Sequence, residues 1–80
     1  MKLQKAVALR ISQLLLKNKL TRYAICKHTL LTEQCLTRIL NEKNKDIKLL
    51  TITKLSKGLN ISISNFFDDK LFDFNNLNLD

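Results

Sequence analysis

The sequence contains no proline and a single glycine, Gly58, among its 80 residues. Tight β-hairpins depend on Asn-Gly, Asp-Gly or Gly-Gly turns, and the chain contains none of these pairs. It also lacks the glycine-rich loop with which many nucleotide-binding proteins hold phosphate groups. We therefore expect neither a β-rich domain nor a phosphate-binding loop of that type.

Cysteine and histidine are scarce as well, and Cys26, His28 and Cys35 are the only ones. Two cysteines do not make the disulfide framework of a small secreted domain, so we expect reduced, buried thiols in a cytosolic protein. A zinc site needs about four ligands, and residues at i and i+2 face different sides of a helix. The same geometry argues against a Cys-His nucleophile, and we expect no metal, no cofactor and no enzyme activity.

Long apolar runs are absent, and the apolar stretch near the N-terminus, residues 6–9, is interrupted by Arg10. We therefore expect neither a membrane span nor a signal peptide. Leucine and isoleucine nevertheless number 24 of the 80 residues. That is enough apolar side chain for the small core of one domain, and too much for a disordered basic tail.

Acidic residues are few in the first three quarters of the chain. Residues 1–60 contain 13 Lys and Arg against 3 acids, whereas residues 61–80 contain Lys70 against 4 Asp. The formal charge of +7 is thus +10 in the body and −3 at the end. Clustered Lys and Arg indicate a protein that binds a polyanion, and the alternative is a high charge that serves solubility alone.

Apolar residues recur at helical spacing along most of the chain, which predicts an all-α fold of five helices. The first is expected at residues 3–17, where one stripe of the helix is apolar and consists of Leu3, Val7, Ile11, Leu14 and Leu15. Leu9 and Leu16 lie on the opposite face. They are either exposed or packed on another part of the protein or on a second subunit.

The remaining helices are expected at residues 22–28, from 33 to 40 or 41, at 49–59, and after Ser62. Ile25 and Cys26 of the second helix are expected to face inward. The fourth has Ile52, Leu55 and Leu59 at helical spacing, and the fifth carries Ile63, Phe66 and Phe67. Thr21, Thr32 and Ser62 stand at N-cap positions. Asn60 suits a left-handed residue after the fourth helix.

The third predicted helix has the most informative surface. On a helical wheel its buried face is Leu36, Ile39 and Leu40. The opposite face carries groups that hydrogen-bond base edges and phosphates, on Gln34, Thr37, Arg38 and Asn41. Any soluble helix has a polar outer face, so this face alone does not indicate DNA binding. The order of helices and turns along the chain is stronger evidence. A short capped helix, a three-residue turn and a second capped helix form the helix-turn-helix arrangement.

The same segments resemble the lambda-repressor-like helix-turn-helix family, often called the Cro/phage repressor or Xre family. The resemblance covers residues 3–67 and is carried by residues 20–27 (LTRYAICK), 31–41 (LTEQCLTRILN) and 55–67 (LSKGLNISISNFF). It implies a five-helix DNA-binding domain over residues 1–67, with residues 33–41 in the major groove of double-stranded DNA. Leu30 and Glu42 stand where the family usually has glycine. A left-handed Leu30 would cost on the order of 1 kcal/mol.

Carried over by position, the resemblance implies two groups of DNA contacts. Base edges would be read by Glu33, Gln34, Thr37, Arg38 and, from the following loop, Asn44. Phosphates would be contacted by Thr21, Arg22, Asn41, Lys43 and Lys45. Glu33 has a second interpretation, because an acid in the first turn of a helix also complements the helix dipole, and we favour it.

Residues 68–80 form an acidic, aromatic C-terminal segment. Phe66 and Phe67 are expected to close the core, and the apolar residues that follow exceed what one small core needs. We expect them to pack on a second subunit or on the face of Leu9 and Leu16, and the alternative is a frayed end.

These observations predict a sequence-specific transcriptional regulator, a repressor that binds DNA as a homodimer. The expected location is the cytoplasm of a bacterium, near the nucleoid, with a bacterial or phage gene. Two alternatives are open. One is an antitoxin or phage-type accessory protein that binds DNA and also a protein partner through the C-terminal segment. The other is a protein-binding module that keeps the fold without reading DNA.

Overall fold

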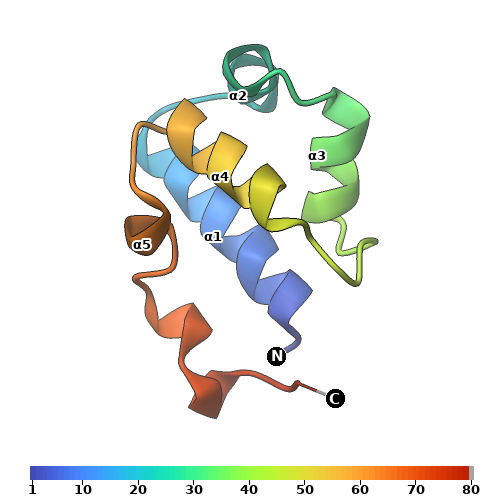
Figure 1. Cartoon of the computed structure of the whole chain (residues 1–80), viewed down its shortest axis with the longest axis vertical. Helices are drawn as coiled ribbons and strands as arrows, with labels where there is room; N and C mark the ends of the chain where they lie inside the picture. The colour runs from blue at the N-terminus through green and yellow to red at the C-terminus, as the bar shows by residue number, and fades with distance from the viewer. Residues whose placement is uncertain (80) are drawn as a thin grey trace.

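In the computed structural model, which describes residues 1–79, five α-helices surround one apolar core (Figure 1). They are α1 (Leu3–Lys17), α2 (Arg22–Thr29), α3 (Glu33–Leu40), α4 (Leu49–Gly58) and α5 (Ile63–Phe66). Two short 3-10 turns follow, η1 (Lys70–Phe72) and η2 (Phe74–Asn76). The only β pairing in the described part of the chain is an isolated bridge between Lys2 and Asn78. The predicted all-α fold of five helices is confirmed.

Each helix contributes at least one fully buried apolar side chain to the core. Ile11, Ile25, Leu36, Leu55 and Phe66 come from α1 to α5 in order, and each is at most 1% exposed. α1 packs on α3, α2 packs on both α3 and α4, and α4 packs on α5. On their core-facing sides, α3 is therefore supported by α1, and α2 is supported by α4.

Gly58, the only glycine, lies where the last turn of α4 approaches α2 most closely. A Cβ atom at this position would collide with the side-chain methyl group of Thr29 and would touch the end of Ile25 at 3.0 Å. Thr29 is itself buried, and its hydroxyl donates to the carbonyl of Ile25 at 2.7 Å. The absence of a side chain at position 58 thus allows α4 to pack closely against α2.

The apolar stripe predicted for α1 is correct except at its first residue. Val7, Ile11, Leu14 and Leu15 are buried, whereas Leu3 is 45% exposed because it begins the helix at the edge of the core. The opposite face is open, with Leu16 82% exposed. No helix among residues 1–79 is both long enough and apolar enough to cross a membrane.

The three predicted N-caps form as expected. The hydroxyl oxygens of Thr21, Thr32 and Ser62 each accept a hydrogen bond from the backbone N–H three residues later, at 3.1, 3.0 and 3.0 Å. These bonds satisfy amides that have no partner within the helix. They fix the first turns of α2, α3 and α5.

Helix ends use left-handed residues other than glycine. The φ angles are 54° at Lys19, 61° at Leu30, 60° at Glu42 and 59° at Asn60. In α1, α3 and α4 the residue after the left-handed one closes the C-terminal end of the helix, because its N–H donates to the carbonyl five positions back. These bonds run from Leu20 to Leu15, from Lys43 to Arg38 and from Ile61 to Ser56. The expected left-handed conformation of Asn60 is confirmed. Leu30 and Glu42 adopt the backbone conformation that glycine would adopt without strain.

The C-terminal segment folds back on the first half of α1 (Figure 1). Arg10 joins the two, since its guanidinium donates to the carbonyls of Phe66 and Asn65 at 2.7 and 2.8 Å and pairs with Asp69 at 3.4 Å. Phe72 stacks edge-on against Phe67, with 4.9 Å between the ring centroids.

The end of the segment lies beside the start of the chain. The Met1 ammonium group donates to the Asn76 carbonyl at 2.6 Å, and the Asn78 N–H donates to the Met1 carbonyl at 2.7 Å. Packing on a second subunit or on the face of Leu9 and Leu16, and the alternative of a frayed end, stay predictions. Asp80 lies outside the described residues.

Replacing Leu30 by glycine should stabilise the protein. The side chain of Leu30 is 89% exposed, so its loss removes little packing while the left-handed strain disappears. We expect the free energy of unfolding of Leu30→Gly to rise by about 1 kcal/mol, measured by chemical denaturation.

Leu30→Ala is the matched control for this substitution. Alanine also lacks the exposed side chain, but it keeps a Cβ atom and therefore the strain. Its stability should remain close to that of the wild type. A glycine variant no more stable than the alanine variant would contradict the assignment of strain to this turn.

Candidate nucleic-acid interface

The helix-turn-helix unit consists of α2, the turn of residues 30–32 and α3. Leu36 and Ile39 anchor α3, since each is only 1% exposed and both belong to the core. Leu40 is half-buried and packs beside them. The predicted inner face of α3 is therefore confirmed, and its outer face points away from the protein.

The outer face of α3 carries most of the predicted base-reading residues. Glu33, Gln34 and Arg38 are exposed, and Thr37 is half-buried. Gln34 and Arg38 line a shallow depression beside the helix, and the half-buried Asn44 lines it from the loop that follows. The remaining lining residues are Thr32 and Cys35. Three of the five predicted readers thus meet around one hollow.

Glu33 and Thr37 are not among the residues that line this depression. Both lie on the other flank of α3, because four positions advance a helix by slightly more than one turn. Glu33 stands in the first turn of the helix, directly after its N-cap Thr32. That position is consistent with complementing the helix dipole, which is the interpretation favoured above.

The predicted phosphate contacts lie at the edges of this face. Thr21 and Arg22 are exposed at the start of α2, and the Thr21 hydroxyl, which accepts from the N–H of Ala24, retains its own proton for donation. Asn41, Lys43 and Lys45 are exposed at and after the end of α3. The predicted phosphate contacts therefore stand on two sides of α3, which carries most of the predicted base readers.

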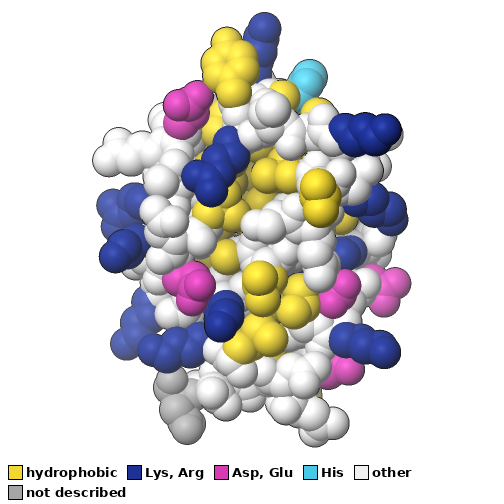
Figure 2. Space-filling view, turned by 180° about the vertical axis from the view of Figure 1, so that it is seen from behind, with side chains coloured by type: hydrophobic (Ala, Val, Ile, Leu, Met, Phe, Trp, Pro, Cys, Tyr) yellow, Lys and Arg dark blue, Asp and Glu magenta, His cyan; other side chains and the backbone are white. Residues whose placement is uncertain are grey.

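Cations and acids alternate along this face, where Arg38, Lys43 and Lys45 stand among Glu33, Glu42 and Asp46. Within residues 1–79 the only ion pair joins Arg10 to Asp69, away from α3. Figure 2 shows Lys and Arg side chains along both edges of this view, with acidic side chains on the edge where α3 lies and a group of them low on the opposite edge. The formal net charge of +7 favours association of the whole molecule with a polyanion.

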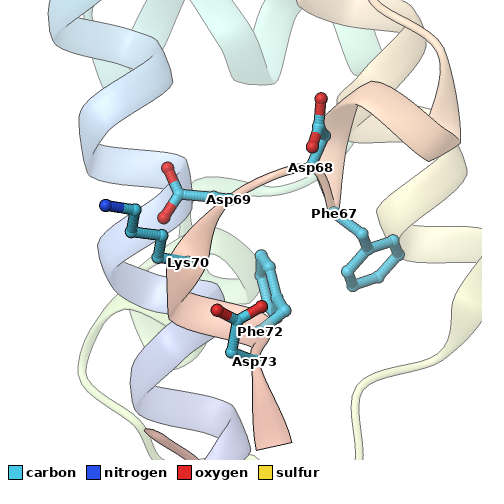
Figure 3. A pocket seen from close by; sticks show the side chains of 6 residues that line it. All are labelled: Phe67, Asp68, Asp69, Lys70, Phe72 and Asp73. Atoms are coloured by element: carbon cyan, nitrogen blue, oxygen red, sulfur yellow. The ribbon is translucent and has the colours of Figure 1, made fainter.

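A second hollow lies in the C-terminal segment and has the opposite electrostatic character. It is lined by Phe67, Asp68, Asp69, Lys70, Phe72 and Asp73 (Figure 3). Asp69 is paired with Arg10, and Asp68 and Asp73 remain beside the one ammonium group of Lys70, so the hollow is unfavourable for phosphate. DNA is therefore expected to approach the α3 face and not this one.

The two cysteines differ in their surroundings. Cys26 of α2 is buried, and burial raises the pKa of its thiol, with smaller contributions from Glu33 and Cys35. Cys35 is only half-buried, so the expectation of two buried thiols is wrong for this residue. Sequence reasoning also missed Cys35 as part of the outer surface. The available signal was its position three residues before Arg38, on the same flank of the helix.

Comparison with known proteins agrees with this geometry. The family model of the Cro/C1-type HTH DNA-binding domain matches residues 10–70, a range that contains all of α2 to α5. Searches of curated proteins and of solved structures return no match. With a family match over most of its length and a helix-turn-helix held by a buried α3, the chain belongs to the Cro/C1-type HTH DNA-binding domains.

Proposed function

We propose that the protein is a sequence-specific transcriptional regulator that reads the major groove of double-stranded DNA with α3. The observation that carries the proposal is the depression where Gln34, Arg38 and Asn44 meet on the exposed side of a rigidly held helix. Amide and guanidinium groups make the bidentate contacts that distinguish adenine and guanine in the major groove.

The proposed mode of action is repression by occupancy. The described residues form one packed unit whose basic side engages DNA, and a protein bound in this way blocks access to the same stretch of duplex. Lys43 and Lys45, together with Arg22 on the other side, fix the orientation of α3 by contacting the two phosphate backbones. The cytoplasm, where DNA is accessible, is the proposed location.

We further propose that the protein binds as a homodimer. α3 has only eight residues, so one copy reads few base pairs, and a second copy on a neighbouring half-site supplies the missing specificity. Exposed apolar side chains for association are available, since Leu16 and Phe74 are each 82% exposed.

The base readers should control which sequence is bound. We expect Gln34→Ala and Arg38→Ala each to change the sequence selected from random duplex DNA at one or two positions, and to weaken binding to the wild-type site by about 1–3 kcal/mol. Selection followed by sequencing measures the change. If both variants select the same site as the wild type, α3 does not read DNA as proposed.

Lys43 should contribute affinity without specificity. Lys43→Ala removes one phosphate contact, so it should weaken all duplexes about equally and reduce the slope of log affinity against log salt by about 0.9. Titrations at several salt concentrations measure both effects. Lys54→Ala is the matched control, because Lys54 is an exposed lysine of α4 outside the proposed interface. Binding that is absent at low salt, or insensitive to salt, would favour a protein-binding module instead.

The dimer predicts the form of the selected site. Two copies related by a two-fold axis should select an inverted repeat whose half-site centres are about 10 base pairs, or a multiple of that, apart. Sedimentation of the complex should show two copies on each duplex. A single unrepeated site that binds one copy would contradict the dimer.

A further inference from the structure

Cys35 belongs to the depression beside α3 but has no role in the base reading described above. It lines the hollow together with Thr32, Gln34, Arg38 and Asn44. Those four residues carry hydroxyl, amide or guanidinium groups, which are strong hydrogen-bonding groups. A thiol is a weak donor and behaves as a small apolar surface. The depression therefore combines hydrogen-bonding groups with apolar surface, and the thiol of Cys35 is one apolar spot in it.

The surroundings of Cys35 hold this spot in place. The residue is half-buried and packs against the hydrophobic core next to the buried face of α3. Its backbone N–H donates to the hydroxyl oxygen of Thr32 at 3.0 Å, which fixes the first turn of the helix. A side chain packed on one side and open on the other presents a contact surface of fixed position.

The chemistry of the bases indicates what such a hollow accepts. In the major groove thymine presents the O4 acceptor beside a 5-methyl group, whereas cytosine presents an amino group and no methyl. Guanine and adenine present no methyl group either. A hollow that combines hydrogen-bond donors with one apolar spot therefore matches thymine better than the other three bases.

We propose that this depression is a thymine subsite in which Cys35 contacts the 5-methyl group, and a neighbouring amide or guanidinium group donates to O4. The proposal rests on the proposed reading of DNA by α3 and adds one specificity-determining residue to it. Removing one methyl group from water changes an affinity about three- to fivefold, and this is the preference expected for thymine over a base that lacks only the methyl.

The test replaces thymine by deoxyuridine, which differs only by the absence of the 5-methyl group. In a duplex selected by the wild-type protein, each thymine is replaced in turn and the affinity is measured. We expect the wild type to lose about three- to fivefold at one thymine of each half-site. Cys35→Ser should show equal affinity for the two duplexes at that position, because the hydroxyl offers no apolar contact.

Two further variants serve as controls. Cys35→Ala, which also shortens the side chain, should reduce the discrimination, and thermal melting followed by circular dichroism shows whether each variant is folded. Cys26→Ala removes the other, buried cysteine and should keep the wild-type ratio between thymine and deoxyuridine.

The outcomes separate this subsite from the general function. A specific site whose affinity is unchanged at every deoxyuridine overturns the subsite and leaves the DNA-reading proposal intact. A loss that persists in Cys35→Ser assigns the methyl contact to another residue and also overturns it. Failure of the wild type to select any sequence overturns the proposed function and the subsite with it.

Discussion

The orientation of the candidate DNA-binding face of α3 depends on the burial of Leu36 and Ile39. These two side chains lie one turn apart on α3 and are almost completely removed from water by α1 and α2. Rotating α3 about its axis would expose them, at about 1.5–3 kcal/mol for each side chain. The rotation of α3 is therefore fixed, and Gln34 and Arg38 have to face outward. A polar surface for DNA thus follows from an apolar one on the opposite side of the same eight-residue helix.

The near absence of glycine has a structural consequence at the helix ends. Lys19, Leu30 and Glu42 adopt left-handed conformations that cost on the order of 1 kcal/mol each, and only Asn60 is of a type that tolerates them well. Three of these ends retain the hydrogen bond to a carbonyl five residues back, which offsets part of the strain. The single glycine is used elsewhere, at the close contact of α4 with α2. The one glycine thus permits a close contact between two helices, and the left-handed turns are formed by other residue types.

The charged residues of the chain differ in their partners. Asp69 of the C-terminal segment pairs with Arg10 of α1, and within residues 1–79 the lysines after α3 form no ion pair. Glu42 and Asp46 stand next to Lys43 and Lys45 in the chain, so the loop after α3 carries acids as well as cations. Arg10 also satisfies two backbone carbonyls at the end of α5. Its role is therefore structural.

Local sequence was sufficient to predict the helices, their limits to within a residue or so, and the N-caps at Thr21, Thr32 and Ser62. These features depend on side chains that act within one or two turns. The resemblance to known helix-turn-helix proteins supplied the left-handed candidates Leu30 and Glu42 and the set of DNA-contacting residues. Errors occurred where burial is decided by distant segments. Leu3 is exposed at the end of α1, and Cys35 is only partly covered.

The sequence by itself determined an all-helical domain with one face of α3 apolar and the other polar, because helical periodicity is a property of neighbouring residues. Only the tertiary structure decided which polar residues of that face meet. It brings Asn44 of the following loop to the depression that Gln34, Cys35 and Arg38 line. It also decided that Asp69 pairs with Arg10 and that residues 76–78 lie beside Met1 and Lys2. Both results depend on contacts between segments that are separated in the chain, which no local pattern specifies.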